Sequence, residues 1–174
     1  MDGATRAREV LRIRARNTNV NERTLLATDY LNHFNEALML AEMVNDVPEM
    51  LEDFLDWQSR RYVDHFRESS LADRDLAIAA FPYSPPEYRA PFDAITHALD
   101  TEIRALQQHF AAAREQRRVA PGEERLAEQC RAIRHLIDRA GAIINGYMPD
   151  AAPPLAQADS RTALGQEAIN ALFD

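Results

Sequence analysis

Hydrophobic residues recur at every third or fourth position over most of the chain, the spacing of one face of a helix. The first long run covers residues 22–44, and a second covers 49–68 after a short polar break that contains Pro48. So short a connection predicts an antiparallel helical hairpin. The expected inward positions are Leu26, Tyr30, Phe34, Ala37, Leu38, Ala41 and Val44, then Leu51, Phe54, Leu55, Tyr62 and Phe66.

Prolines divide the second half of the chain. A shorter helix is expected at 71–80, and the prolines within 82–86 interrupt it, because proline lacks a donor and disfavours helix in the residue before it. Pro91 is expected in the first turn of the next helix, which runs to about residue 116. Its inward positions are Phe92, Ile95, Leu99, Ile103, Leu106, Phe110 and Ala113.

One more helix is expected at 123–145, after a turn at 119–122, and Gly146 suits its C-terminal cap. The sequence therefore predicts an all-α fold, a mainly antiparallel, four-helix-like bundle over residues 20–146. The inward positions of its last helix are Leu126, Cys130, Ile133, Ile137, Ala140 and Ile144.

Composition and charge narrow the class of protein. The net charge of -8 argues against a general nucleic-acid binder, since little would offset phosphate repulsion. No apolar run is long enough for a membrane span, and the start lacks the apolar region of a signal peptide, so we expect a cytoplasmic location. Every basic residue is Arg, which favours a bacterial source with a GC-rich genome. We expect no cofactor, and a homodimer is left open.

The N-terminal segment, residues 1–19, is locally basic on an acidic protein. Five arginines alternate with Val10, Leu11 and Ile13, which makes the segment weakly amphipathic. An anionic membrane surface or an acidic partner would suit it. The alternative is a frayed helix whose arginines pair with the acidic bundle.

The last part of the chain is separable from the bundle by composition. Residues 147–160 are rich in Pro and Ala and read as a stiffened linker. Residues 161–174 follow, and on a helix their hydrophobic and polar side chains fall on opposite sides. The apolar side holds Leu164, Ala168, Ile169, Leu172 and Phe173, and the polar side holds Gln166, Glu167, Asn170 and Asp174.

This C-terminal peptide resembles the segment by which flagellar motor switch proteins bind the phosphorylated chemotaxis response regulator. That pattern is close to L-S-Q-x-E-I-D-A-L-L. Asn170 stands where Asp is usual, Phe173 where Leu is usual, and Ala168 where Glu is usual. The matching positions are Leu164, Gln166, Ile169, Ala171 and Leu172.

The order of parts is also similar to that of a chemotaxis phosphatase, which ends in a short amphipathic peptide tethered to a helical bundle. The resemblance implies a CheY-like response regulator as partner and leaves open whether the body dephosphorylates it. That phosphatase uses an acid followed by Gln four residues later, a spacing absent from the bundle. A spacing of three, seen in another class of chemotaxis phosphatase, occurs at Asp29/Asn32 and Glu42/Asn45. The alternative for the peptide is a final helix that packs on its own bundle or, in an oligomer, on a neighbour.

Four histidines are each followed by an acid three residues later, the spacing that supplies ligands in carboxylate-bridged di-iron bundles. They give the alternative function, a metal-binding helical bundle. If the two helices of the hairpin are continuous, His65 lies about 7 Å further along the bundle than His33. We therefore expect that the two pairs do not meet at one metal, and we assign no metal ligands. The pairs are His33/Glu36, His65/Glu68, His97/Asp100 and His135/Asp138, the last two expected to face solvent.

Tyr30-x-x-His33-Phe34-x-Glu36 recurs as a second Tyr-x-x-His-Phe-x-Glu motif that begins at Tyr62. Nothing around either copy extends the similarity. A phosphoryl-carrying His33 is a further interpretation, but the Lys-Gly pair usual beside such a histidine is absent. The apolar neighbours of His33 suit a partly buried structural histidine better.

Overall fold

A computed structural model describes residues 2–115 and 123–148 of the chain. Within these ranges the structure is helical and contains no strand, which confirms the all-α prediction. Its elements are α1 (Gly3–Ala15), η1 (Thr28–Tyr30), α2 (Leu31–Met43), α3 (Met50–Asp56), α4 (Tyr62–Glu68), α5 (Arg74–Ala80), η2 (Phe81–Tyr83), α6 (Pro86–Glu115) and α7 (Glu123–Ile144). No helix within the described ranges carries an apolar run long enough to cross a membrane.

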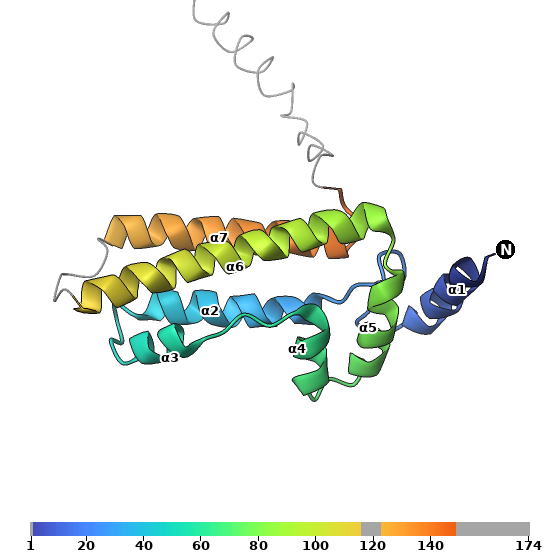
Figure 1. Cartoon of the computed structure of the whole chain (residues 1–174), viewed down its shortest axis with the longest axis horizontal. Helices are drawn as coiled ribbons and strands as arrows, with labels where there is room; N and C mark the ends of the chain where they lie inside the picture. The colour runs from blue at the N-terminus through green and yellow to red at the C-terminus, as the bar shows by residue number, and fades with distance from the viewer. Residues whose placement is uncertain (1, 116–122, 149–174) are drawn as a thin grey trace, which may run out of the picture.

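The bundle has four positions, and three of them are single helices. α6 and α7 are the longest and run antiparallel, and α2 packs on α7 (Figure 1). The fourth position is filled by α3, an extended stretch at 57–61 and α4, in that order along the chain. α5 and α1 pack together at the end of the bundle where α6 begins and α7 ends (Figure 1).

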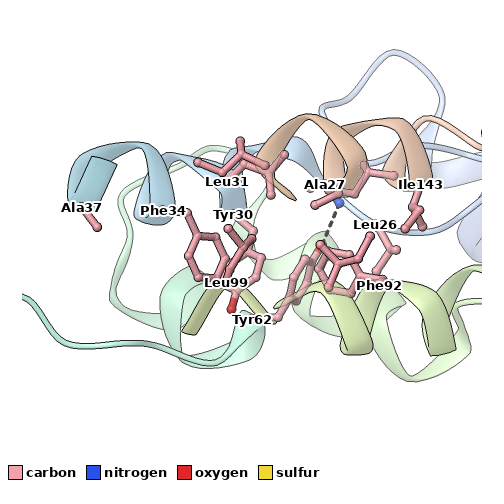
Figure 2. Close-up of a cluster of buried hydrophobic side chains, with 14 of the residues drawn as sticks. Leu26, Ala27, Tyr30, Leu31, Phe34, Ala37, Tyr62, Phe92, Leu99 and Ile143 are labelled. Carbon is pink, nitrogen blue, oxygen red and sulfur yellow. Dashed lines mark hydrogen bonds between the residues drawn. The ribbon is translucent and has the colours of Figure 1, made fainter. Parts of the chain in front are cut away.

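One continuous hydrophobic core joins all of these elements. Phe34, Phe92 and Leu99 are at most 1% exposed and meet between α2 and α6 (Figure 2). The expected inward positions of α6 and α7 are all buried except Ala113, which is half-buried. The long uninterrupted repeats therefore located the core correctly.

The predicted helix at 22–44 is wrong in its first third. Residues 17–27 form a loop in which Val20 and Ala27 make an isolated bridge, and α2 begins only at Leu31. The side chain of Asn21 causes the break, because its Oδ1 accepts hydrogen bonds from the backbone N–H groups of Arg23 (2.9 Å) and Thr24 (3.0 Å). The inward prediction for Leu26 still holds, since that side chain is fully buried from the loop.

The predicted helix at 49–68 is also wrong, because it is two helices. α3 ends at Asp56, residues 57–61 are extended, and α4 starts at Tyr62. In a continuous helix one of residues 58 and 59 would face the core, but both are polar. That gap between Leu55 and Tyr62 was the signal in the sequence.

The ends of the two long helices follow local chemistry. α6 begins at Pro86, earlier than expected, so Pro91 lies in its second turn and not in its first. At the end of α7 the backbone N–H of Gly146 donates to Ile143 O and that of Tyr147 to Ala142 O, both at 2.9 Å. Gly146 has φ +88°, the left-handed conformation that this helix-ending motif requires, and its predicted capping role is confirmed.

α1 is the helix that the basic N-terminal segment forms. It packs on α5 and η2 through Leu11 and Ala15, which are 7% and 2% exposed. The Nε of Arg8 donates to the backbone oxygen of Tyr83 at 3.0 Å, so one arginine fastens the helix to η2. The other side of α1 faces solvent.

Candidate functional site

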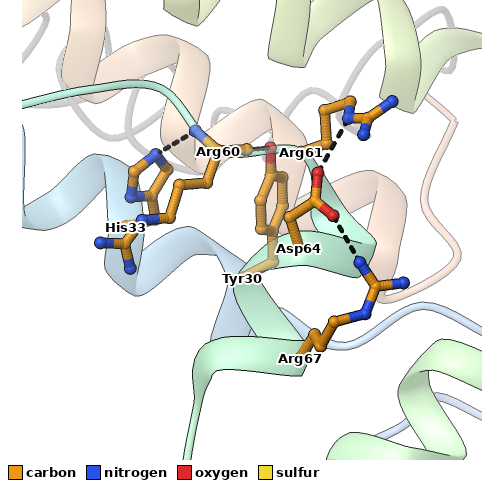
Figure 3. A network of polar contacts seen from close by, with 6 residues as sticks. All are labelled: Tyr30, His33, Arg60, Arg61, Asp64 and Arg67. Atoms are coloured by element: carbon orange, nitrogen blue, oxygen red, sulfur yellow. Dashed lines mark hydrogen bonds and ion pairs between the residues drawn. The ribbon is translucent and has the colours of Figure 1, made fainter.

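The extended residues 57–61, here called the strap, lie across the bundle and are held by side chains from α2 and the turn before it. The backbone N–H of Arg60 donates to Nε2 of His33 at 2.8 Å, and the hydroxyl of Tyr30 donates to the backbone oxygen of Arg60 at 2.7 Å (Figure 3). The backbone N–H and the backbone oxygen of Arg60 thereby bind side chains, in place of the backbone partners that they would have in a helix. The strap is fixed from the side of α2.

α6 and a tryptophan hold the rest of the strap. Nε2 of Gln107 donates to the backbone oxygens of Phe54 and Trp57, both at 2.8 Å. The indole Nε1 of Trp57 donates to the backbone oxygen of His33 at 3.2 Å, and its ring stacks on the His33 imidazole with centroids 4.5 Å apart. Ser59 Oγ donates to the carboxylate of Asp100.

The strap brings together the two Tyr-x-x-His copies of the sequence. The ring centroids of Tyr30 and Tyr62 are 5.2 Å apart, and those of His33 and His65 are 6.0 Å apart. The prediction that the two histidine pairs would not meet at one metal is not contradicted, because residues 2–115 and 123–148 contain no group of side chains arranged to hold a metal ion. Its counting assumed one continuous helix over 49–68, and that assumption is wrong, because the helix breaks at the strap.

Burial sets the protonation of these side chains. Desolvation, with smaller contributions from His65 and Arg60, lowers the pKa of His33 to about 4, and desolvation also lowers the pKa of His65. Desolvation raises the pKa of Tyr30 and of Tyr62. At neutral pH both histidines are uncharged, and because Nε2 of His33 is an acceptor, its ring proton resides on Nδ1.

A cleft of about 550 Å³ opens on one side of the strap, between α4, η2 and the first half of α6. Asp64 pairs with Arg61 (2.9 Å) and Arg67 (2.8 Å) across its rim (Figure 3). Arg89 lies over the Phe81 ring, with its guanidinium carbon 3.4 Å from the ring centroid, and its Nε donates to Asp93 at 2.9 Å. Each arginine that lines this cleft has an acidic partner among the described residues, so the cleft is rich in charges that already neutralise one another.

A second cleft, of about 650 Å³, lies on the other side of the strap and shares Arg60 with the first. Its lining includes His33, Trp57 and four carboxylates, those of Glu36, Asp53, Asp56 and Glu68. The acids that follow the two histidines thus reach the same cleft. Arg60 neutralises part of this charge through an ion pair with Glu68 at 3.3 Å.

This second cleft is the place to test the metal-binding alternative. Nε2 of His33 is engaged by the backbone N–H of Arg60, and the carboxylate of Glu68 is engaged by the Arg60 guanidinium. Residues 2–115 and 123–148 contain no group of three His, Cys, Asp or Glu side chains arranged to hold a metal ion. His97 and His135 are exposed, as predicted. The metal-binding alternative stays a prediction.

Side chains with nucleophilic atoms have structural roles here. Ser84 Oγ donates to the backbone oxygen of Thr24 at 2.7 Å. Burial raises the pKa of the Cys130 thiol to about 11, so it is protonated at neutral pH. Glu42, one of the acids with an amide three residues later, pairs with Arg134 of α7. These contacts hold the bundle together.

The predicted partner-binding residues, 164–173, lie outside the described residues, as do most of the linker and the peptide helix at 161–174. Comparison with protein-family models, with curated proteins and with solved structures gives no match for this chain. What the fold and the site define is an all-α bundle whose fourth position is interrupted by the strap. The sequence reasoning missed the strap and its contacts.

Proposed function

We propose that the chain is an adaptor that binds a CheY-like response regulator through its C-terminal peptide. The apolar side of that peptide fills a groove on the regulator, and Gln166 and Asn170 set its register. Ala171 supplies a small side chain beside them. The hydrophobic side chains that enter the groove are Leu164, Ile169, Leu172 and Phe173.

The observation that carries the proposal is the agreement of Leu164, Gln166, Ile169, Ala171 and Leu172 with the regulator-binding pattern, together with the separation of polar and apolar sides. Two features of the body support it. The cap at Gly146 ends α7 before the peptide begins, and the described helices bury their own hydrophobic core. A peptide that follows the capped end of α7 is separate from this core and is suited to bind a partner.

Binding is better supported than hydrolysis of the phosphoryl group. The pair Glu42/Asn45 has the acid-to-amide spacing of three, but the carboxylate of Glu42 pairs with Arg134. Asp29, the other such acid, precedes α2 and is followed by the exposed Asn32. We therefore assign the body the role of carrying the peptide.

The test is a titration of a synthetic peptide of residues 158–174 against CheY-like response regulators of the source organism, each with and without phosphorylation. We expect saturable binding that is stronger to the phosphorylated form. Ile169→Asp is the control, and it should weaken binding by about tenfold or more, because an unpaired carboxylate buried in an apolar groove costs more than ~1.4 kcal/mol. Failure of the peptide to bind any of these regulators would refute the proposal.

A further inference from the structure

An apolar groove runs along the solvent side of α1, where α1 meets α5 and η2. It has a volume of about 440 Å³, and its walls are formed by Ala7, Val10 and Leu11 on one side and Ala79 and Tyr83 on the other. Val10 is 51% exposed, and Ile13, one turn further, is 53% exposed. These two are the most exposed aliphatic β-branched side chains of the described helices, and Val10 lines the groove.

Arginines border this apolar strip. Arg6 lies one turn before Val10, and Arg14 lies one turn after it, and both are exposed. Neither has an acidic partner within the described residues, whereas Arg16 pairs with Glu22 at 3.4 Å. The surface thus combines exposed hydrophobic side chains with two positive charges that are available to an acidic ligand.

The C-terminal peptide can reach this groove. The hydroxyl of Thr24 donates to the backbone oxygen of Ile144 at 2.6 Å, and Ser84 donates to Thr24 at 2.7 Å, so the end of α7 is tied to the residue after Tyr83. α7 ends at the same end of the molecule as α1 (Figure 1). Residues 149–163 separate the described end of the chain from Leu164, and a stretch of that length can span up to about 50 Å.

We propose that residues 164–174 dock as an amphipathic helix in the groove between α1 and α5, so that the chain covers its own recognition peptide. This inference rests on the proposed function, because the peptide that binds the regulator is the same peptide that docks in the groove. The apolar side of the peptide covers Val10 at the wall of the groove. The net negative charge of residues 149–174 complements Arg6 and Arg14 at the border of the groove.

Charge favours this occupant. Residues 149–174 carry four acids and one arginine, opposite in sign to α1, with its arginines and single glutamate. A second copy of α1 would instead place arginine against arginine, which is repulsive.

The test uses the full chain with a nitroxide spin label on Asn170→Cys. The natural Cys130 is buried and protonated, so the label goes to the introduced thiol. We expect paramagnetic broadening of the amide signals of Val10 and Ile13. Met39 on α2, which is 52% exposed, is the control and should show no broadening. Ile169→Asp in the labelled chain should abolish the broadening.

A second measurement separates this inference from the proposed function. Because docking lowers the fraction of free peptide, Val10→Asp with Ile13→Asp should tighten regulator binding by the full chain by roughly five- to tenfold, and Met39→Asp should not. Equal regulator affinity of the wild type and the groove variant, with no broadening at α1, overturns the inference and leaves the function standing. Broadening at α1 without any regulator binding supports the inference and refutes the function.

Two other occupants of the groove would be recognised in the same experiments. Broadening that appears only between labelled and unlabelled chains in a mixed sample assigns the groove to a second copy. Binding of vesicles that contain phosphatidylglycerol, lost with Val10→Asp and seen without broadening by the label, assigns it to an anionic membrane surface. Either result overturns the inference.

Discussion

Lowering the pH should destabilise this protein through His33 well before its carboxylates are protonated. The folded state keeps His33 neutral down to about pH 4, because the buried residue, 4% exposed, is desolvated and lies near His65 and Arg60. In the unfolded chain the same ring is protonated near its ordinary pKa of 6.5. Between these two values the unfolded chain binds more protons, so the free energy of unfolding falls as the pH falls through this window.

The size of the effect follows from the two pKa values. The contribution of His33 to stability is fully present above pH 6.5 and is lost progressively towards pH 4. Between about pH 8 and pH 5 the loss is on the order of 2 kcal/mol. His65, whose pKa burial also lowers, adds a loss of the same sign.

Urea unfolding followed by far-UV circular dichroism at a series of pH values measures this dependence. His33→Gln retains an acceptor but no titrating group, so it should remove about 2 kcal/mol of the difference between pH 8 and pH 5. His97→Gln changes an exposed histidine on α6 and is the matched control, which should behave as the wild type. If His33→Gln shows the full pH dependence of the wild type, the assigned environment of His33 is wrong.

Three further perturbations test the packing and the alternative function. Tyr62→Phe leaves the buried backbone N–H of Ala27 without its acceptor, now at 2.8 Å (Figure 2), and should cost about 1–3 kcal/mol in thermal unfolding; no loss would contradict this bond. Gly146→Ala places a Cβ at φ +88° and 3.1 Å from Cδ of Arg23, and should destabilise the protein by about 1 kcal/mol in urea; an unchanged midpoint would exclude the strained cap. Elemental analysis by mass spectrometry should find far less than one iron or zinc ion per chain in the purified protein. If the protein instead contains one metal ion per chain, and His33→Ala and His65→Ala remove it, the protein belongs to the metal-binding class.

The long helices could be predicted from the sequence because their hydrophobic repeats are uninterrupted. Ile95, Leu99, Ile103 and Leu106 lie one turn apart on α6, and each faces the core. The periodicity of such a helix is set by its own residues, so no knowledge of its neighbours is needed. The same holds for α7.

The strap could not be predicted this way, because distant side chains decide it, whereas the loop at 17–27 follows the local hydrogen bonds of Asn21. The backbone N–H and oxygen of Arg60 find their partners in His33 and Tyr30, which lie 27 and 30 residues earlier in the chain. The sequence predicts Tyr30 as inward and His33 as partly buried, but it does not show that their polar atoms bind the backbone of Arg60. The assumption of one continuous helix over 49–68 was wrong for this reason, and the position of His65 depends on where that helix breaks.

The stacking of Trp57 on His33 gives the protein an optical probe at one defined place. Trp57 is the single tryptophan of the chain, and its indole lies 4.5 Å from the imidazole, centroid to centroid. A protonated imidazole in that position quenches indole fluorescence, so emission intensity reports the charge of one buried histidine and the attachment of the strap together. Rapid mixing to acidic pH can therefore time the release of the strap separately from the unfolding of the long helices.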